Sequence, residues 1–166
     1  MICHECNSEM KESQETYHYL ESGLDNIYLE DICVYRCKCG EFFPSVPGII
    51  DLHTMIGQMI IKKSTALNGK EIIFLRKNIG LNARTFAEYV GIDKSTFSRW
   101  ENGQQKLAKP NDRLIRLIYA NVKGLPKNDI EHLLKEAVKD FNGSESEERI
   151  SIPKSSFSSQ QRDERV

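Results

Sequence analysis

The sequence predicts a mainly α-helical protein that begins with a small β domain. Two observations carry this prediction. All five cysteines fall within the first 39 residues, around the stretch NIYLEDICVYR, whose β-branched and aromatic residues are typical of one or two short strands. From residue 52 onward, apolar residues recur with the spacing of amphipathic helices instead. With 166 residues, the chain is long enough for two small domains.

Charge is distributed unevenly along the chain. Residues 1–51 contain 3 basic and 10 acidic side chains, a net charge of −7, whereas residues 70–121 contain 10 basic and 5 acidic side chains, a net charge of +5. An acidic first domain and a basic second one suggest different partners. The sequence has no apolar run of membrane-spanning length, and its start does not resemble a signal peptide. We therefore expect a cytoplasmic protein, in which clustered cysteines are more often metal ligands than disulfides.

The cysteines have the spacing of metal ligands. They occur in CHEC at 3–6 and in CVYRCKCG at 33–40. A Cys-x-x-Cys turn directs two sulfurs at one ion, and two such turns brought together form a zinc ribbon or knuckle. The sequence therefore predicts one structural Zn²⁺ per chain, bound by Cys3, Cys6, Cys37 and Cys39. With four thiolates bound, zinc has no open position for water, so it would hold the fold without doing chemistry.

The ligand set leaves alternatives open. Cys33 is a third candidate in the second group, although its place in a predicted strand favours a small buried side chain. His4 or His18 could replace one cysteine, and five reduced cysteines without a metal are a further alternative. Gly40, directly after Cys39, fits the tight turn that a zinc knuckle needs.

The rest of the chain predicts helices. Apolar residues spaced at i, i+3, i+4 and i+7 predict a helix within residues 51–69, and four short helices follow in 70–121. Asn82 and Asp93 are expected to cap the second and third of these four, with Gly91 as the turn between them. A further amphipathic helix is expected at 126–141. Residues 142–166 have few sizeable apolar groups, so we expect a disordered tail.

The third of the four short helices, from Asp93 to Asn102, is two-sided. Phe97 and Trp100 fall on one side and are expected in the core, whereas Ser98 and Arg99 fall on the other. Short hydroxyl groups beside an arginine suit close approach to DNA, because Arg pairs with guanine edges and Ser or Thr bonds phosphates or bases. Glu101 is expected to be structural, beside Arg99. The residues expected to contact DNA are Arg84, Lys94, Ser95, Thr96, Ser98, Arg99, Asn102, Gln104 and Lys106.

The run LNARTFAEYVGIDKSTFSRWENGQQKLAKPNDRLIRLI resembles the Xre/Cro-type helix-turn-helix family. The matching residues are Ala87, Gly91 and the segment from Phe97 to Gly103. Together with the N-terminal cysteine turns, the chain resembles the MqsA-like, or YgiT-type zinc finger, antitoxins over roughly residues 1–121. By this resemblance Arg99 matches the base-contacting arginine of the family. Ser95 falls where those antitoxins have a base-contacting Asn, and Ala83 where many Xre domains have a phosphate-binding Gln.

The resemblance implies a fold and a function. We expect a zinc-binding domain at 1–50, a linker helix at 51–69, a five-helix helix-turn-helix domain with an additional C-terminal helix at 70–141, and the tail at 142–166. The implied function is an antitoxin of a type II toxin-antitoxin system that also represses its own operon. Its implied partners are operator DNA, a second copy in a homodimer, and a toxin held by the zinc domain. In the cell it would lie in the cytoplasm, on the nucleoid when bound to DNA.

The sequence also allows two other binding functions. The chain could be a stand-alone Xre-type regulator, for example of a phage or mobile element, whose zinc domain is structural. It could also be a zinc-ribbon adaptor that binds only protein. The four histidines are scattered and no phosphate loop or GxSxG motif is present, so we expect no enzymatic activity.

Overall fold

The computed structural model of the protein describes residues 1–136 and 148–158. The chain divides into two compact units, Met1–Leu52 with Glu148–Val166 and His53–Glu147, and the division falls within the first helix. They are called the first and the second unit below. In the described part of the chain, no helix combines the length and the apolar character that crossing a membrane would require.

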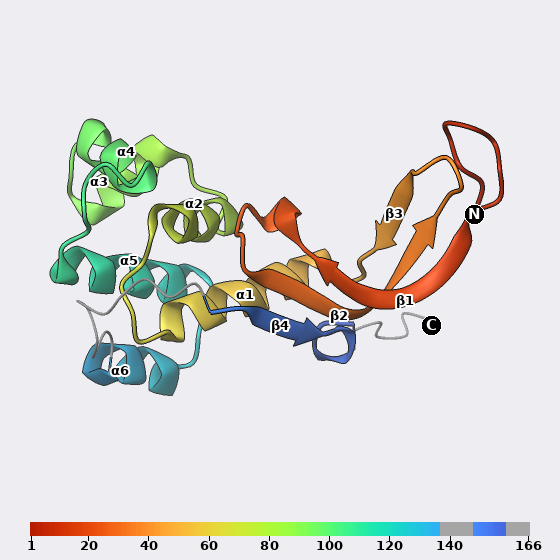
Figure 1. The fold of residues 1–166 in the computed structure, drawn as a ribbon. Helices are drawn as coiled ribbons and strands as arrows, with labels where there is room; N and C mark the ends of the chain where they lie inside the picture. The colour runs from red at the N-terminus through yellow and green to blue at the C-terminus, as the bar shows by residue number, and fades with distance from the viewer. Residues whose placement is uncertain (137–147, 159–166) are drawn as a thin grey trace, which may run out of the picture. The chain divides into compact units, whose positions relative to one another are not determined.

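The first unit is built on one four-stranded sheet (Figure 1). Its strands are β1 (Lys11–His18), β2 (Ile27–Arg36), β3 (Phe42–Ser45) and β4 (Ile150–Pro153). β2 is the central strand: it pairs antiparallel with β1 and β3 and parallel with β4. The small β region expected near the N-terminus is therefore present, and β2 is the strand that NIYLEDICVYR predicts. β1 and β3 lie outside that stretch and were not predicted.

A bulge keeps the apolar residues of β2 on one face. Ile27 and Leu29 are fully buried, and after them Ile32 and Val34 are fully buried as well, which breaks strict alternation. The pairing with β1 shifts at this point, and Asp31 has a left-handed φ of 59°. An extra residue in one strand reverses which face the following side chains point to. Because of the bulge, Ile27 and Leu29 before it and Ile32 and Val34 after it all face the same core.

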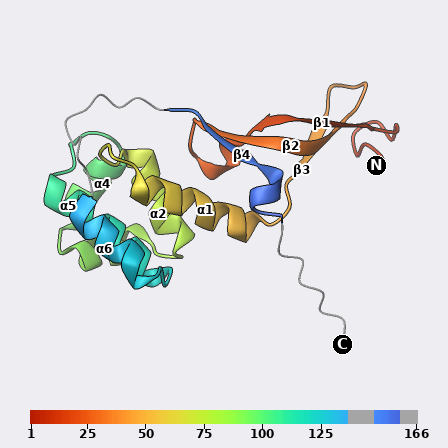
Figure 2. The same cartoon turned by 90° about the horizontal axis from the view of Figure 1, so that it is seen from below.

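The prediction of a disordered tail is wrong for residues 148–158. β4 pairs with β2, as Figure 2 shows, and its continuation forms the 3-10 helix η2 (Lys154–Ser156). Ile152 and Phe157 are 1% and 3% exposed. Composition failed here because a strand that adds to an existing sheet edge needs few apolar groups of its own. The remainder of the predicted tail, and residues 137–141 of the predicted last helix, lie outside the described residues.

The second unit is helical. Its elements are most of α1 (Ile49–Lys62), followed by α2 (Gly69–Asn78), α3 (Ala83–Val90), α4 (Lys94–Glu101), α5 (Lys109–Val122) and α6 (Lys127–Glu136). The predicted caps are confirmed: the side chain of Asn82 accepts a hydrogen bond from Thr85 N and that of Asp93 from Thr96 N. Gly91 ends α3 at a left-handed φ of 78°. The predicted linker helix stops at Lys62, before residue 69.

Two glycines allow close approach of helices in the second unit. A Cβ atom at Gly57 of α1 would lie 1.9 Å from the hydroxyl oxygen of Tyr119 in α5. A Cβ atom at Gly69, the first residue of α2, would lie 2.3 Å from the carbonyl oxygen of Glu101 at the end of α4. Larger residues at either position would push these helices apart, so both glycines fix the helix packing.

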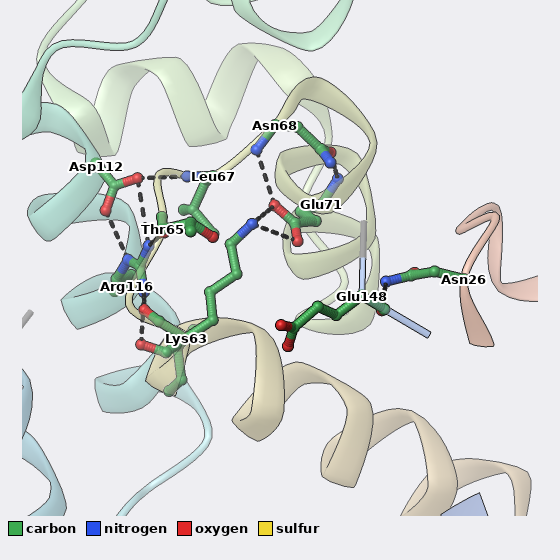
Figure 3. Close-up of polar contacts among 10 residues, drawn as sticks. Asn26, Lys63, Thr65, Leu67, Asn68, Glu71, Asp112, Arg116 and Glu148 are labelled. Carbon is green, nitrogen blue, oxygen red and sulfur yellow. Dashed lines mark hydrogen bonds and ion pairs between the residues drawn. The ribbon is translucent and has the colours of Figure 1, made fainter. Parts of the chain in front are cut away.

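Residues 63–68, between α1 and α2, are held by a buried arginine (Figure 3). Arg116 of α5 has no exposed surface, and Nε donates to Oδ1 of the fully buried Asp112 at 2.6 Å. Its two terminal nitrogens donate to the carbonyl oxygens of Ile61, Lys63 and Thr65 at 2.9, 2.7 and 2.6 Å. The other oxygen of Asp112 accepts from the backbone N–H of Leu67 at 2.7 Å.

A second polar group lies beside the first and starts α2. Asn68 accepts from Glu71 N, and Glu71 accepts from Asn68 N in return, which forms a capping box. Lys63 donates to both carboxylate oxygens of Glu71 at 2.7 Å. Side chains of Arg116, Asp112 and Glu71 therefore bind four backbone groups of the connection between α1 and α2.

Replacing Arg116 with Met should destabilise the second unit by about 3–5 kcal/mol, because it leaves the Asp112 carboxylate buried without its cation. Urea unfolding followed by the fluorescence of Trp100, the single tryptophan, measures this change. Lys62→Met is the matched control. Its ion pair with Asp129 is exposed, so removing it should cost less than about 1 kcal/mol. Equal stability of the two variants would contradict a central role for Arg116.

Candidate metal centre and candidate nucleic-acid interface

Four cysteine sulfurs converge in the first unit. The sulfurs of Cys3, Cys6, Cys37 and Cys39 all lie within 4.8 Å of one another. Cys6 and Cys37 are 3.3 Å apart, and Cys3 and Cys39 are 3.6 Å apart, too far for a disulfide, whose S–S bond is about 2.05 Å. A tetrahedral ion with metal–sulfur distances of about 2.3 Å separates its ligands by about 3.8 Å. The four cysteines could therefore bind one metal ion.

Backbone geometry brings these sulfurs together. The first turn closes through hydrogen bonds from Cys3 N to Ser8 O and from Asn7 N to Cys3 O, and Asn7 has a left-handed φ of 55°. The second turn follows β2 directly and closes from Gly40 N to Cys37 O, with φ of 101° at Gly40. Each pair of cysteines is thus followed by one left-handed residue. Gly40 occupies the tight turn that its place in the sequence predicted.

The remaining candidates do not join the cluster. Cys33 is 8% exposed in β2 and is not among the clustered sulfurs, as expected for a small buried side chain. His18 stacks on the ring of Tyr28 at 4.4 Å, and its Nε2 lies 2.7 Å from the carbonyl oxygen of Asp25. Within the described part of the chain, His4 and His18 do not belong to the cluster. The donor set is therefore four thiols.

Hydrogen bonds in the cluster shift the pKa values of Cys6 and Cys39 in opposite directions. Hydrogen bonds from Ser8 lower the pKa of Cys6 to about 6. The pKa of Cys39 rises to about 12, because hydrogen bonds with the thiols of Cys37 and Cys6 outweigh a hydrogen bond from the backbone of Glu41. A divalent ion would neutralise several thiolates at once, which is the chemistry of a thiolate metal site.

The second candidate site is the outer side of α4. Its inner side is buried as predicted: Phe97 has no exposed surface and Trp100 is 4% exposed. Phe97 lies between two other rings, with centroid distances of 5.4 Å to Phe86 of α3 and 6.2 Å to Trp100. This aromatic contact fixes α4 against α3 across the Gly91 turn, and it decides which residues of α4 face outward.

The residues predicted to contact DNA lie mainly on the surface of the second unit. Those with exposed side chains are Arg84, Lys94, Ser95, Ser98, Arg99, Asn102, Gln104 and Lys106, whereas Thr96 is half-buried. Within residues 1–136 and 148–158, the guanidinium of Arg99 has no hydrogen-bond or ion-pair partner, whereas its backbone carbonyl accepts from Gln104 N and Gln105 N. Arg84 forms an exposed i,i+4 pair with Glu88 at 3.2 Å. Asn102 Nδ2 lies 3.3 Å from the hydroxyl oxygen of Ser98.

The Asp93 carboxylate accepts hydrogen bonds from two hydroxyl groups at the start of α4. Ser95 Oγ donates to Asp93 Oδ1 at 2.5 Å, and Thr96 Oγ1 donates to Oδ2 at 2.6 Å. These bonds, with that from Ser95 the largest cause, lower the pKa of Asp93 far below its ordinary value. Because each hydroxyl has one hydrogen, Ser95 and Thr96 are left as acceptors on their outer side. The sequence identified Asp93 as a cap but not this second effect.

Glu101 is structural, and its partner is Arg76. Its carboxylate accepts from Nε of Arg76 in α2 at 2.7 Å, and both side chains are nearly buried. Arg76 also donates from Nη1 to the carbonyl oxygen of Leu81, before α3. Arg76 therefore joins α2, the start of α3 and the end of α4, and it leaves Arg99 unengaged. Sequence reasoning gave Arg76 no role.

Comparison of the chain with protein-family models, with curated proteins and with solved structures found no match. The resemblance to Xre/Cro-type domains and to MqsA-like antitoxins thus remains an expectation from the sequence.

Substitution of Cys6 with Ser should abolish stoichiometric metal binding, whereas Cys33→Ser should leave one metal ion per chain. The reason is that Cys6 contributes a sulfur to the cluster and Cys33 does not. Elemental analysis of the purified proteins gives the stoichiometry. Cobalt(II) substitution adds an independent measurement, because cobalt–thiolate absorption reports sulfur ligation directly. Loss of the metal in Cys33→Ser with retention in Cys6→Ser would show that the ligand set is wrong.

Proposed function

We propose that the chain is a sequence-specific DNA-binding protein that represses transcription of its own gene. In this proposal α3, the Gly91 turn and α4 form a helix-turn-helix, and α4 enters the major groove. The observation that carries it is Arg99: an exposed, unengaged guanidinium on the outer side of a helix whose inner side is fixed by buried aromatic rings. A forked, unpaired donor held in this way suits bidentate contact with the O6 and N7 atoms of guanine.

The groups around Arg99 support the same proposal. Ser98 and Asn102 share its side of the helix and offer hydrogen bonds to bases or phosphates. Lys94, Lys106 and Arg84 would add phosphate contacts, which make affinity depend on salt. The Asp93 carboxylate orients the Ser95 and Thr96 hydroxyls so that their free lone pairs accept hydrogen bonds. This favours base amino groups, those of adenine and cytosine, near the start of α4.

The metal in this proposal is one structural Zn²⁺ per chain. Four cysteine sulfurs without a histidine or a carboxylate form a soft, compact donor set that suits zinc. A zinc ion held by all four has no open position, so it would join the N-terminal turn to the turn after β2 without activating water. The first unit then serves as a binding module, and we propose no catalytic role for it.

We further propose that the first unit binds a partner protein, as an antitoxin holds its toxin. Its residues 1–51 carry a net charge of −7. On its surface, Phe42 and Phe43 are 49% and 52% exposed, and a hollow next to Phe42 is lined by Glu21 and by Glu15, which is paired with Arg36. Exposed aromatic rings beside acidic groups suit a basic protein partner. The alternative remains a stand-alone regulator, in which this surface has no toxin to bind.

Repressors with a helix-turn-helix bind paired half-sites, so the active form in this proposal is a homodimer in the cytoplasm. The second unit exposes several apolar side chains that could join two copies: Met59 of α1, Val122 of α5 and Leu134 of α6.

Arg99→Ala should weaken binding to DNA upstream of the gene by about 1–3 kcal/mol, because it removes a bidentate base contact. Gel-shift titration at fixed salt concentration measures the change. Lys127→Ala, in α6, removes an equally exposed cation outside the proposed interface and should bind like the wild type. Equal affinities of wild type and Arg99→Ala would show that α4 does not read bases.

The protein-partner proposal has its own test. Co-expressed with the product of the reading frame adjacent to its gene, the chain should co-purify with that product. Phe43→Asp should weaken the complex about tenfold or more, because a central aromatic contact is lost. Arg99→Ala should leave the complex intact, so the two functions separate. An adjacent product that does not bind the wild type would favour the stand-alone regulator.

A further inference from the structure

The C-terminal segment, residues 148–158, lies on the first unit in the manner of a bound peptide. β4 runs parallel to β2, with Ile150 opposite Ile27 and Ile152 opposite Leu29. The other edge of β2 is taken by β1, and β3 pairs only with residues 33–36 of β2. The half of β2 before the bulge would therefore have one unpaired edge without this segment. In Figure 2, β4 follows β2 there.

Two apolar anchors hold the segment. Ile152 is 1% exposed and Phe157 is 3% exposed, whereas Ser151, Pro153, Ser155 and Ser156 between and beside them are exposed. The backbone of Phe157 approaches Gly48 so closely that a Cβ atom there would lie 2.5 Å from the carbonyl oxygen of Phe157. Gly48 thus leaves the space in which the end of the segment lies.

Polar contacts define the start of the segment. Asn26 Nδ2 donates to the carbonyl oxygen of Glu148 at 2.8 Å, as Figure 3 shows, and the carbonyl oxygen of Asn26 accepts from Ile150 N at 2.8 Å. The guanidinium of Arg149 lies 4.1 Å from the ring centroid of Tyr28. The site therefore selects a peptide with a cation, an aliphatic residue three positions later and an aromatic residue five positions after that.

We propose that residues 148–158 are a detachable intramolecular ligand of a strand-accepting site, which consists of the Ile27–Glu30 edge of β2 and the two sites that receive Ile152 and Phe157. The segment pairs over four residues only, and Pro153 has no N–H with which to continue the pairing. The conformational entropy lost in ordering such a short segment offsets much of the free energy gained by burying its two anchors. The segment therefore opens locally before the unit unfolds. An extended peptide of the same pattern can then displace it. This inference does not depend on DNA binding.

Opening of this contact changes the topology of the chain. The first unit contains residues 1–52 and 148–158, so the chain leaves it for the second unit and then returns. While the segment is docked, the second unit is attached to the first at both of its ends; when the segment leaves, it is attached at one. A competing peptide would thereby free residues 148–158 from the first unit without touching the cysteine cluster.

The test uses the full chain and a labelled synthetic peptide, ERISIPKSSFS, which reproduces residues 148–158. Ile152→Asp in the chain places a charge in an apolar site and should free the docking site. Fluorescence anisotropy should then show the peptide binding to this variant at least about 100-fold more tightly than to the wild type, because a covalently attached competitor has an effective concentration on the order of mM. Ser156→Asp, which adds the same charge at an exposed position of the segment, should behave like the wild type.

Three further measurements test whether the peptide binds at the proposed site. A peptide with Asp in place of Ile152 should not bind the freed site. A far-ultraviolet circular dichroism spectrum like that of the wild type shows that the Ile152→Asp variant is folded, and Arg149→Ala serves as a milder variant with a several-fold effect. Equal peptide binding to the wild type and Ile152→Asp, or binding to neither, would overturn the proposal. So would a dimeric wild type that becomes monomeric in Ile152→Asp, because the segment would then dock on a second copy.

Discussion

The second unit depends on one buried ion pair. The guanidinium of Arg116 is shared between the buried Asp112 carboxylate and the backbone carbonyls of Ile61, in the last turn of α1, and of Lys63 and Thr65 after it. A buried charge of this kind is tolerated only when its polar atoms find partners, and here each nitrogen of the guanidinium donates a hydrogen bond. The guanidinium thereby supplies hydrogen bonds to the backbone carbonyl oxygens of Ile61, Lys63 and Thr65. It fixes the path of the chain from α1 into α2.

That path determines where the outer side of α4 lies within the second unit. α2 begins at Gly69, whose missing side chain admits the carbonyl oxygen of Glu101 at the end of α4. Near the other end of α2, Arg76 binds the carboxylate of the same Glu101 and the chain before α3. With α4 held at its end by α2 and along its inner side by Phe97, Arg99 can only point away from the core. The exposure of Arg99 is thus a consequence of buried contacts on other helices.

Sequence analysis succeeded where the signal is local. The caps at Asn82 and Asp93, the inward Phe97 and Trp100, and the choice of Cys37 over Cys33 all follow from spacings within one turn or one strand. It failed where the partner is distant in the sequence. β1 is polar and is recognised as a strand only once β2 is beside it, and Arg116 looks like a surface residue until the carbonyls after α1 surround it. The prediction of a disordered tail failed for the same reason, because β4 becomes a strand only where it pairs with β2.

β2 is the strand on which both β4 and the cysteine cluster support the first unit. A unit this small buries too little apolar surface to be stable by its core alone. Its core is one face of β2, and the bulge at Asp31 extends that face over the whole strand. The first half of the strand gains Ile152 from β4, and Cys37 and Cys39 of the cluster follow its last residue. A metal ion bound by the cysteines and the added strand β4 would therefore stabilise opposite ends of the same element.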